Sequence, residues 1–221
     1  MASLRKTQNR VKRKIKPIGH FMKLKEKLRN YFKKKSKFSI ASDIVFVLLL
    51  IALAFPSSRM LVVSTVQRIT LFAPSAEKED DRKTINDAAY QWQFKKLEGR
   101  QVNLGAFKNE VVFLNFWATW CPPCVAEMPS IQKLYDDYKG EVSFLLVTNE
   151  KAETVNRFMQ KKGLNMPIYL NQYQPPEDFS TSTIPTTYII SKNGEIVMDK
   201  EGAARWNSKK VKKILDDLVA E

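Results

Sequence analysis

The two cysteines of this chain, Cys121 and Cys124, stand three residues apart with only prolines between them. An unbroken apolar run, VVFLNFW (111–117), comes just before them, and apolar residues at helical spacing continue to Tyr138. A run of this length and composition predicts a strand that is covered on both faces. Prolines lack an N–H group and are tolerated in the first turn of a helix. The pattern therefore predicts an α/β domain in which both thiols lie where a buried strand turns into a helix.

Several kinds of site can use two cysteines at this spacing. A structural zinc site needs four ligands, and the only histidine, His20, lies in the distant N-terminal region. The same shortage of histidine argues against a cysteine–histidine hydrolase and against a copper site that requires a histidine. A structural disulfide across two residues would constrain little of the unfolded chain. We therefore interpret the pair as a redox-active dithiol that needs no metal and no cofactor.

The position of the two thiols predicts different roles for them. At the N-terminus of a helix, free N–H groups and the positive end of the helix dipole favour a thiolate, so we expect Cys121 to attack a partner disulfide. Cys124 lies one turn further along the helix and is expected to be more buried. We expect Cys124 to resolve the mixed disulfide that the attack creates.

Strand and helix signals alternate through the rest of the C-terminal region. The turn dipeptide Asn193-Gly194 indicates a hairpin, and Gly163 indicates the end of a helix. This order predicts one domain over 85–221, with a mixed central sheet and helices on both of its faces. Strands are expected at 90–94, 111–117, 142–148, 167–170, 186–191 and 195–200, and helices at 121–138, 152–162 and 207–219.

The N-terminal region carries a membrane signal. The run FSIASDIVFVLLLIALAF (38–55) contains one charged residue, and as a helix of about 27 Å it would cross the hydrocarbon core of a bilayer. Residues 1–37 hold 15 lysines and arginines against one acidic residue, and so account for the net charge of +14. We expect a basic cytoplasmic tail (1–37), a single transmembrane helix (38–55), an interfacial segment and linker (56–84), and a folded domain outside the cytoplasm.

Other interpretations of this region fit the sequence less well. A buried helix of a soluble domain would show a polar face, which the run 44–55 lacks. The basic region is longer than that of a cleaved secretory signal, and it is not notably rich in serine as an organelle transit peptide would be. Residues 38–221 hold 22 basic and 22 acidic residues, so we expect no nucleic-acid partner for the domain. The basic tail fits an anionic membrane leaflet.

The motif itself resembles a known family. WCPPC after a buried strand, with a hairpin and a helix downstream, is similar to the thioredoxin fold. NFWATWCPPC followed by AEMP resembles the membrane-anchored TlpA/ResA-like thiol–disulfide oxidoreductases, and the resemblance covers residues 90–218. It implies a thioredoxin-like fold with a sheet of four or five strands, a redox-active Cys121–Cys124 pair and an extracytoplasmic location. In a bacterium this location would be the periplasmic side of the inner membrane.

The resemblance also assigns a groove for substrate. Ile184-Pro185 matches a loop in which the bond before proline is cis and faces the cysteines, whereas an ordinary proline in this place would be trans. The backbone of Ile184 is expected to pair with a bound chain by strand addition. Trp120, Pro122 and Pro123 complete the expected substrate-binding set. The polar segment 171–183 departs from the pattern of relatives, which often have a short helix there, and we expect substrate preference to be set in it.

Glu127 is the expected proton carrier. Soluble thioredoxins have a buried aspartate six residues before the first cysteine, but this chain has Asn115 there, which cannot exchange a proton. The TlpA/ResA pattern places a glutamate three residues after the second cysteine, and Glu127 matches it. At this spacing Glu127 lies on the same helix face as Cys124, near enough to exchange a proton with it. The alternative is a solvated surface glutamate.

Together these features predict a membrane-tethered enzyme that exchanges electrons with disulfides and dithiols of extracytoplasmic proteins. The resemblance favours reduction, for example of apocytochrome c cysteines, with electrons from a membrane donor. A thiol oxidase or isomerase is the alternative direction. A peroxidase of the peroxiredoxin group would want the arrangement Pro-x-x-x-Thr-x-x-Cys, and no proline precedes Cys121 in VVFLNFWAT. A non-enzymatic membrane adaptor that works through its basic tail is a further alternative.

Overall fold

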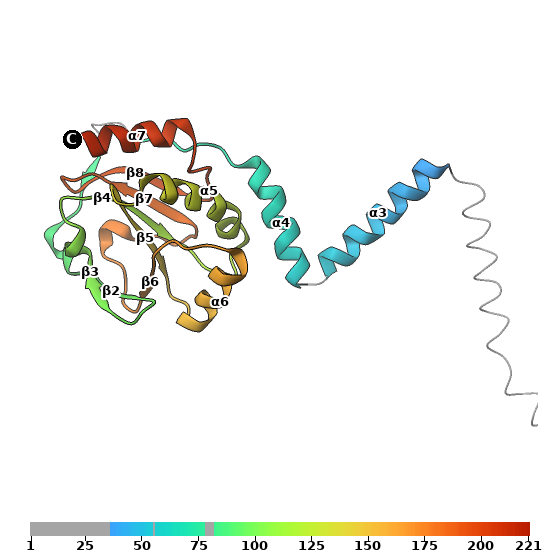
Figure 1. Ribbon diagram of the computed structural model, residues 1–221, viewed down its shortest axis with the longest axis horizontal. Coiled ribbons are helices and arrows are strands. Elements are labelled where there is room, and N and C mark those ends of the chain that lie inside the picture. The colour runs from blue at the N-terminus through green and yellow to red at the C-terminus, as the bar shows by residue number, and fades with distance from the viewer. Residues whose placement is uncertain (1–35, 55, 78–81) are drawn as a thin grey trace, which may run out of the picture. The chain divides into compact units, whose positions relative to one another are not determined.

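Figure 1 shows the computed structural model of the chain, which describes residues 36–54, 56–77 and 82–221. The chain divides into two compact units, Met1–Phe55 and Pro56–Glu221. The basic tail expected at 1–37 lies almost entirely outside the described residues.

The described part of the first unit is helix α3, Lys37–Ala54. Apolar side chains are exposed along the helix, because the sequence gives it no polar face to turn outward. The exposed side chains include Phe38 and every residue from Ile44 to Ile51. Over residues 36–54, 56–77 and 82–221, no helix has the length and apolar character that crossing a membrane requires. The expected transmembrane span at 38–55 is therefore not confirmed by the structure.

The second unit is built on one sheet of eight strands in the order β1-β8-β7-β4-β5-β6-β2-β3. β4 lies in the middle, parallel to β5 and antiparallel to β7. The strands are β1 Lys83–Thr84, β2 Gln93–Lys96, β3 Gln101–Asn103, β4 Val111–Phe116, β5 Val142–Thr148, β6 Ile168–Asn171, β7 Thr186–Ile190 and β8 Glu195–Glu201. The mixed sheet is as predicted, but it is wider than the expected four or five strands. The additional strands β1, β2 and β3 are short and polar and lie toward its edges.

Helices α5 (Pro122–Tyr138), α6 (Ala152–Lys162) and α7 (Lys209–Ala220) flank the sheet, and α4 (Pro56–Thr70) contacts α5. The buried residues of α6 and α7, and most of those of α5, belong to one core cluster, and none of them belongs to the cluster on the other face. This differs from the expected helices on both faces. The chain moves in the same direction across the sheet from β4 to β5 and from β5 to β6. Because crossovers between parallel strands are right-handed, α5 and α6 lie on the same face of the sheet.

On the opposite face of the sheet, the described residues that form the core come from strands, loops and short turns and not from an α-helix. Trp92 and Phe179 pack there among other aromatic rings, together with residues from three short 3₁₀ turns. These turns are η2 Asp87–Gln91, η3 Leu104–Phe107 and η4 Glu177–Phe179. The η2 turn occupies the first two residues of the strand expected at 90–94, because the Asn86 side chain accepts a hydrogen bond from the N–H of Ala89 and so begins a turn. The strand β2 starts only at Gln93.

The central strand β4 explains why the domain has two core clusters. All six of its residues are buried, and successive side chains point to opposite faces of the sheet. Phe113 packs under α5 and α7, where its ring meets those of Phe144 and Trp206. Val112 and Leu114 belong to the cluster on the other face. This double burial is what the continuous apolar run predicted.

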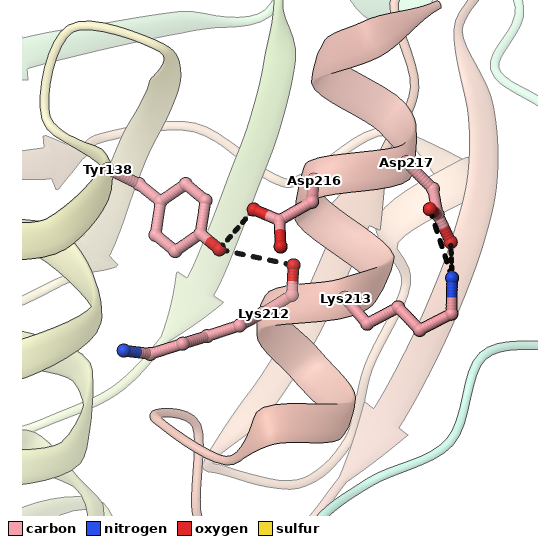
Figure 2. A network of polar contacts seen from close by, with 5 residues as sticks. All are labelled: Tyr138, Lys212, Lys213, Asp216 and Asp217. Atoms are coloured by element: carbon pink, nitrogen blue, oxygen red, sulfur yellow. Dashed lines mark hydrogen bonds and ion pairs between the residues drawn. The ribbon is translucent and has the colours of Figure 1, made fainter.

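Helix α7 is fixed to the C-terminal end of α5 by a polar contact within a mostly apolar interface. Figure 2 shows the side chain of Tyr138, at the end of α5, directed at α7. Its hydroxyl donates to the Asp216 carboxylate at 2.6 Å and lies 3.1 Å from the carbonyl oxygen of Lys212. Lys213 and Asp217 form an ion pair along the exposed side of the same helix. The contact sets the position of α7 and of the loop that precedes it.

Phe113→Ala should lower the free energy of unfolding by about 3–5 kcal/mol, because it removes a fully buried ring from the centre of the sheet and leaves a cavity. Tyr173→Ala is the matched control, since that ring is 58% exposed and should change stability little. Denaturant unfolding of the two variants measures the difference. Equal losses in both would contradict the placement of Phe113 at the centre of the core.

Candidate redox site

The two cysteines lie where the sequence places them, at the start of α5. Cys121 is the N-cap residue, and the two prolines that follow occupy the first two helical positions. The sulfur atoms of Cys121 and Cys124 are joined in a disulfide, with their Cα atoms 5.3 Å apart. The backbone N–H of Cys124 points at the Cys121 sulfur at a distance of 3.2 Å. A donor in this position stabilises negative charge on Cys121 when the disulfide opens.

Both cysteines are buried, Cys121 at 3% exposure and Cys124 at 0%. Cys124 is the more buried of the two cysteines, as expected, but their exposed fractions differ little. The N-cap position therefore distinguishes the two thiols more clearly than burial does. Trp120, next to Cys121, is 63% exposed and stands at the rim of the site, whereas Trp117 is buried and packs against Phe158.

The loop before β7 faces the disulfide. The bond between Ile184 and Pro185 is cis, as predicted. The carbonyl oxygen of Ile184 lies 3.7 Å from the Cys121 sulfur. A chain that places its own sulfur against Cys121 would therefore meet the Ile184 backbone, which is a geometry suited to strand addition.

A cavity of about 230 Å³ opens beside this loop. Trp120 and Ile184 supply apolar walls, and Glu150 stands among the lining residues. The Glu150 carboxylate accepts two hydrogen bonds from Thr119, one from its N–H at 2.6 Å and one from its hydroxyl at 2.7 Å. Both carboxylate oxygens are thus used to hold the segment that leads into Cys121. This role of Glu150 could not be predicted from sequence, because the contact joins residues from two different loops.

Glu127 is buried inside the domain and is not a solvated surface residue. Its side chain is 0% exposed. One oxygen, Oε1, accepts a hydrogen bond from the Asn115 amide at 3.0 Å. The other, Oε2, accepts from the backbone N–H of Ala204 at 3.1 Å and from the indole N–H of Trp206 at 2.8 Å. A buried carboxylate needs hydrogen-bond donors to replace the water that it has lost. Glu127 has three such donors.

Three of the residues around Glu127 were not identified from the sequence. Ala204 and Trp206 lie in the loop between β8 and α7, and Thr187 on β7 accepts a second hydrogen bond from the Asn115 amide at 2.8 Å. They are separated from Glu127 by 60 residues or more along the chain. A buried tryptophan ahead of an amphipathic helix usually indicates packing alone, so only the folded arrangement reveals its donor role.

Burial raises the pKa of Glu127 to about 7, because removal from water penalises the carboxylate. Hydrogen bonds from Trp206, Ala204 and Asn115, and the positive charge of Lys200, act in the opposite direction and keep the pKa from rising further. A carboxyl group that titrates near neutral pH is suited to accept and return a proton. In the described part of the chain, no group of three or more potential ligand side chains could hold a metal ion.

Comparison with known proteins agrees with this chemistry. The profile of the AhpC/TSA family matches residues 85–198. The thiol-disulfide oxidoreductase ResA of Halalkalibacterium halodurans is 40% identical over 114 residues, which cover 50% of this chain and 65% of that protein. ResA of Bacillus cereus is 31% identical over 146 residues, which cover 65% of this chain and 84% of that protein. The match thus spans just under two thirds of the first of these relatives.

A solved structure shows the same fold. The crystal structure of a candidate thiol:disulfide interchange protein DsbE from Chlorobium tepidum superposes with a TM-score of 0.52 at 19% identity. The match covers 67% of this chain and 99% of that one. The expected thioredoxin-like α/β fold is confirmed for the domain.

Glu127→Gln should remove a pH dependence of stability. Between pH about 4.5 and about 7 the folded protein binds the Glu127 proton more tightly than the unfolded chain does, so the free energy of unfolding falls as the pH rises across this interval. The loss should amount to roughly 3 kcal/mol in the wild type and be absent from the variant. Denaturant unfolding of the oxidised protein at several pH values measures it.

Glu141→Gln is the control for this experiment, because Glu141 is an exposed residue just after α5. Its stability should follow the wild-type pH dependence. A Glu127→Gln profile that is parallel to the wild-type profile would contradict the raised pKa.

Proposed function

Because the chain belongs to the AhpC/TSA family and is a relative of the ResA thiol–disulfide oxidoreductases, we propose that it exchanges electrons with disulfides of other proteins through Cys121 and Cys124. The observation that carries the proposal is the disulfide at the N-terminus of α5, which faces a cis-proline loop and stands above a buried glutamate. No cofactor enters the reaction, since the two sulfur atoms carry both electrons.

In the reductive direction the reaction begins with both cysteines reduced. The Cys121 thiolate, stabilised by the N-terminus of α5, attacks one sulfur of the substrate disulfide. A mixed disulfide forms between Cys121 and the substrate, and the first substrate sulfur leaves as a thiolate. The exposed Trp120 and the backbone of Ile184 line the approach and hold the substrate chain beside Cys121. Pro122 and Pro123 contribute the surface of the first helical turn.

The second step depends on Glu127. Cys124 loses its proton to the Glu127 carboxylate and attacks the Cys121 sulfur, which breaks the mixed disulfide. The second substrate sulfur leaves as a thiolate, and the Cys121–Cys124 disulfide forms. Two electrons have then passed from the enzyme dithiol to the substrate, which becomes a dithiol. A thiol–disulfide partner of the opposite redox state, such as a dithiol donor in the membrane, returns the enzyme to its reduced form.

Reduction is the direction we propose, with the disulfide of an apocytochrome c as a candidate substrate before haem attachment. The support is the resemblance of the WCPPC segment and of Glu127 to the TlpA/ResA pattern. A protein thiol oxidase would run the same two steps in reverse, whereas an isomerase would begin with the same attack by Cys121 and be released when another substrate thiol attacks the mixed disulfide. The relative proportion of reduced and oxidised cysteines in cells distinguishes these directions.

We further propose that residues 38–55 tether the domain to the bacterial inner membrane, with the tail 1–37 in the cytoplasm and the domain in the periplasm. Two observations support the tether. The apolar side chains of α3 are exposed over consecutive residues, which leaves a large apolar surface to cover. The charge of +14 is concentrated ahead of this run, as the positive-inside tendency requires for a cytoplasmic N-terminus.

Cys124→Ser should trap the enzyme as a mixed disulfide with a protein substrate such as insulin, because the resolving thiol is absent. Cys121→Ser should neither reduce the substrate nor trap it. Non-reducing electrophoresis and a count of substrate thiols measure both outcomes against the wild type. Trapping by Cys121→Ser in place of Cys124→Ser would reverse the assigned roles. Peroxide consumption that survives Cys124→Ser, without any reduction of protein disulfides, would support the peroxidase alternative.

The membrane tether predicts opposite accessibility for the two ends of the chain. In a Cys121→Ser/Cys124→Ser background of the full chain, Glu98→Cys on the domain surface should react with a membrane-impermeant maleimide in intact bacterial cells whose outer membrane is permeable to it. Ala2→Cys in the tail should react only after the inner membrane is opened. Labelling of Ala2→Cys alone in intact cells would contradict the proposed orientation.

A further inference from the structure

The loop between β8 and α7 supplies a side chain that contacts Glu127 from outside its own helix. Trp206 is fully buried, and its indole N–H donates to Glu127 Oε2 at 2.8 Å. The backbone N–H of Ala204, two residues earlier, donates to the same oxygen. The indole N–H of Trp206 is used by Glu127 and its backbone N–H by Ser130, so Trp206 has no direct place in the exchange reaction described above.

The loop is held firmly against α5. The backbone N–H of Trp206 donates to the Ser130 hydroxyl at 3.2 Å, and that hydroxyl in turn donates to the carbonyl oxygen of Glu127 at 2.8 Å. The indole ring packs edge to face on Phe113 of β4, with the ring centroids 5.0 Å apart. Backbone hydrogen bonds and ring packing thus fix the direction of the indole N–H before any substrate binds.

We infer that Trp206 is a positioning residue for the exchange reaction: its indole N–H occupies Glu127 Oε2 and leaves Oε1 as the oxygen that takes the proton. With two donors on Oε2 and only the Asn115 amide on Oε1, the less saturated oxygen is the more basic of the two. The inference rests on the proposed function, because it assigns a role within that reaction.

A second observation supports the same oxygen. The carbonyl oxygen of Asn115, Oδ1, is buried and has no hydrogen-bond partner, whereas its amide nitrogen donates both to Glu127 Oε1 and to the Thr187 hydroxyl. A half-turn of the amide exchanges its oxygen and nitrogen. Asn115 then accepts from the protonated Oε1 of Glu127 and from the Thr187 hydroxyl. Asn115 can therefore satisfy Glu127 with or without its proton, and it does so only at Oε1.

Few charged or titratable groups face Glu127. Lys200 on β8 acts on it with a positive charge, and Cys124 lies one turn before it on α5. From β4 it faces Asn115, which in turn contacts Thr187 on β7, and from the loop it faces Trp206. These three side chains do not titrate near neutral pH. The indole is thus one of a small set of groups that set the proton affinity of Glu127, and its removal should have a measurable effect.

The test is the pH dependence of kcat/KM for the reduction of a protein disulfide by the full chain. Trp206→Phe removes one donor from the carboxylate, so the midpoint that belongs to Glu127 should move to higher pH by about one unit. That midpoint is identified as the one that Glu127→Gln abolishes. In the double variant Trp206→Phe/Glu127→Gln no shift should remain, because there is no carboxylate to hold.

Trp92→Phe is the matched control. It also removes a buried indole N–H, which donates to Asn171 at 3.2 Å in the other core cluster, and it removes the same volume. It should lower stability to a similar degree and leave the midpoint in place. If Trp206→Phe fails to fold, replacement of Trp206 by benzothienylalanine keeps the ring shape and removes only the N–H, and the same shift is expected.

An unchanged midpoint in Trp206→Phe or in the benzothienylalanine variant, or an equal shift in Trp92→Phe, would overturn the inference. The proposed function fails in a different way, namely if the wild-type chain itself exchanges no thiols with protein disulfides. In that case the role of Trp206 is still read from stability. The pH interval over which Glu127 destabilises the folded protein should extend to higher pH in Trp206→Phe, and an unaltered interval would overturn the inference.

Discussion

The burial of Glu127 is the constraint on which the rest of the site depends. A carboxyl group with no solvent contact must find donors inside the protein, and this one finds three donors on two separate parts of the chain. Asn115 comes from the central strand, whereas Ala204 and Trp206 come from the loop ahead of α7. The carboxylate therefore joins α5, β4 and this loop in one network. The same network that satisfies the group also holds its pKa near neutrality, where proton exchange with a thiol is useful.

The geometry above this network explains how two sulfur atoms are enough for the proposed reaction. The N-cap position of Cys121 provides a backbone donor for the developing thiolate, and the cis bond before Pro185 brings the carbonyl of Ile184 within 3.7 Å of the same sulfur. In the proposed reaction a substrate chain is received on the cis-proline side, while the proton is handled on the buried side by Glu127. The proposal thus assigns attack and resolution to different groups.

Local sequence signals were sufficient for much of the fold. The run 142–148 and the helical segment 152–162 have the predicted bounds, because an apolar run and a terminal glycine each depend on neighbouring residues only. The cysteines at the helix start follow from the two prolines and the preceding apolar run in the same way. The cis bond at Pro185 came from family resemblance, since a proline alone favours trans.

The remaining features depend on contacts between distant residues. β1 joins the sheet through β8 and β2 joins it through β6, both far along the chain, and β3 pairs with β2 at the edge. The residues of β1 and β3 are too few or too polar to indicate a strand. Glu127 itself was predicted as a proton carrier, but the donor role of Trp206 and the acceptor role of Thr187 arise only when β7 and the loop after β8 reach α5 and β4. The role of Glu150 in holding Thr119 is of the same kind.

The central claim, that a buried carboxyl group beside the cysteine pair exchanges protons near neutral pH, can be tested directly by NMR. The side-chain carboxyl carbon of Glu127 in ¹³C-glutamate-labelled protein, assigned by its loss in Glu127→Gln, reports the protonation state. We expect this signal to titrate with a midpoint of about 7 in the oxidised protein. A midpoint at the ordinary glutamate value of about 4.3 would contradict the proposed role of Glu127.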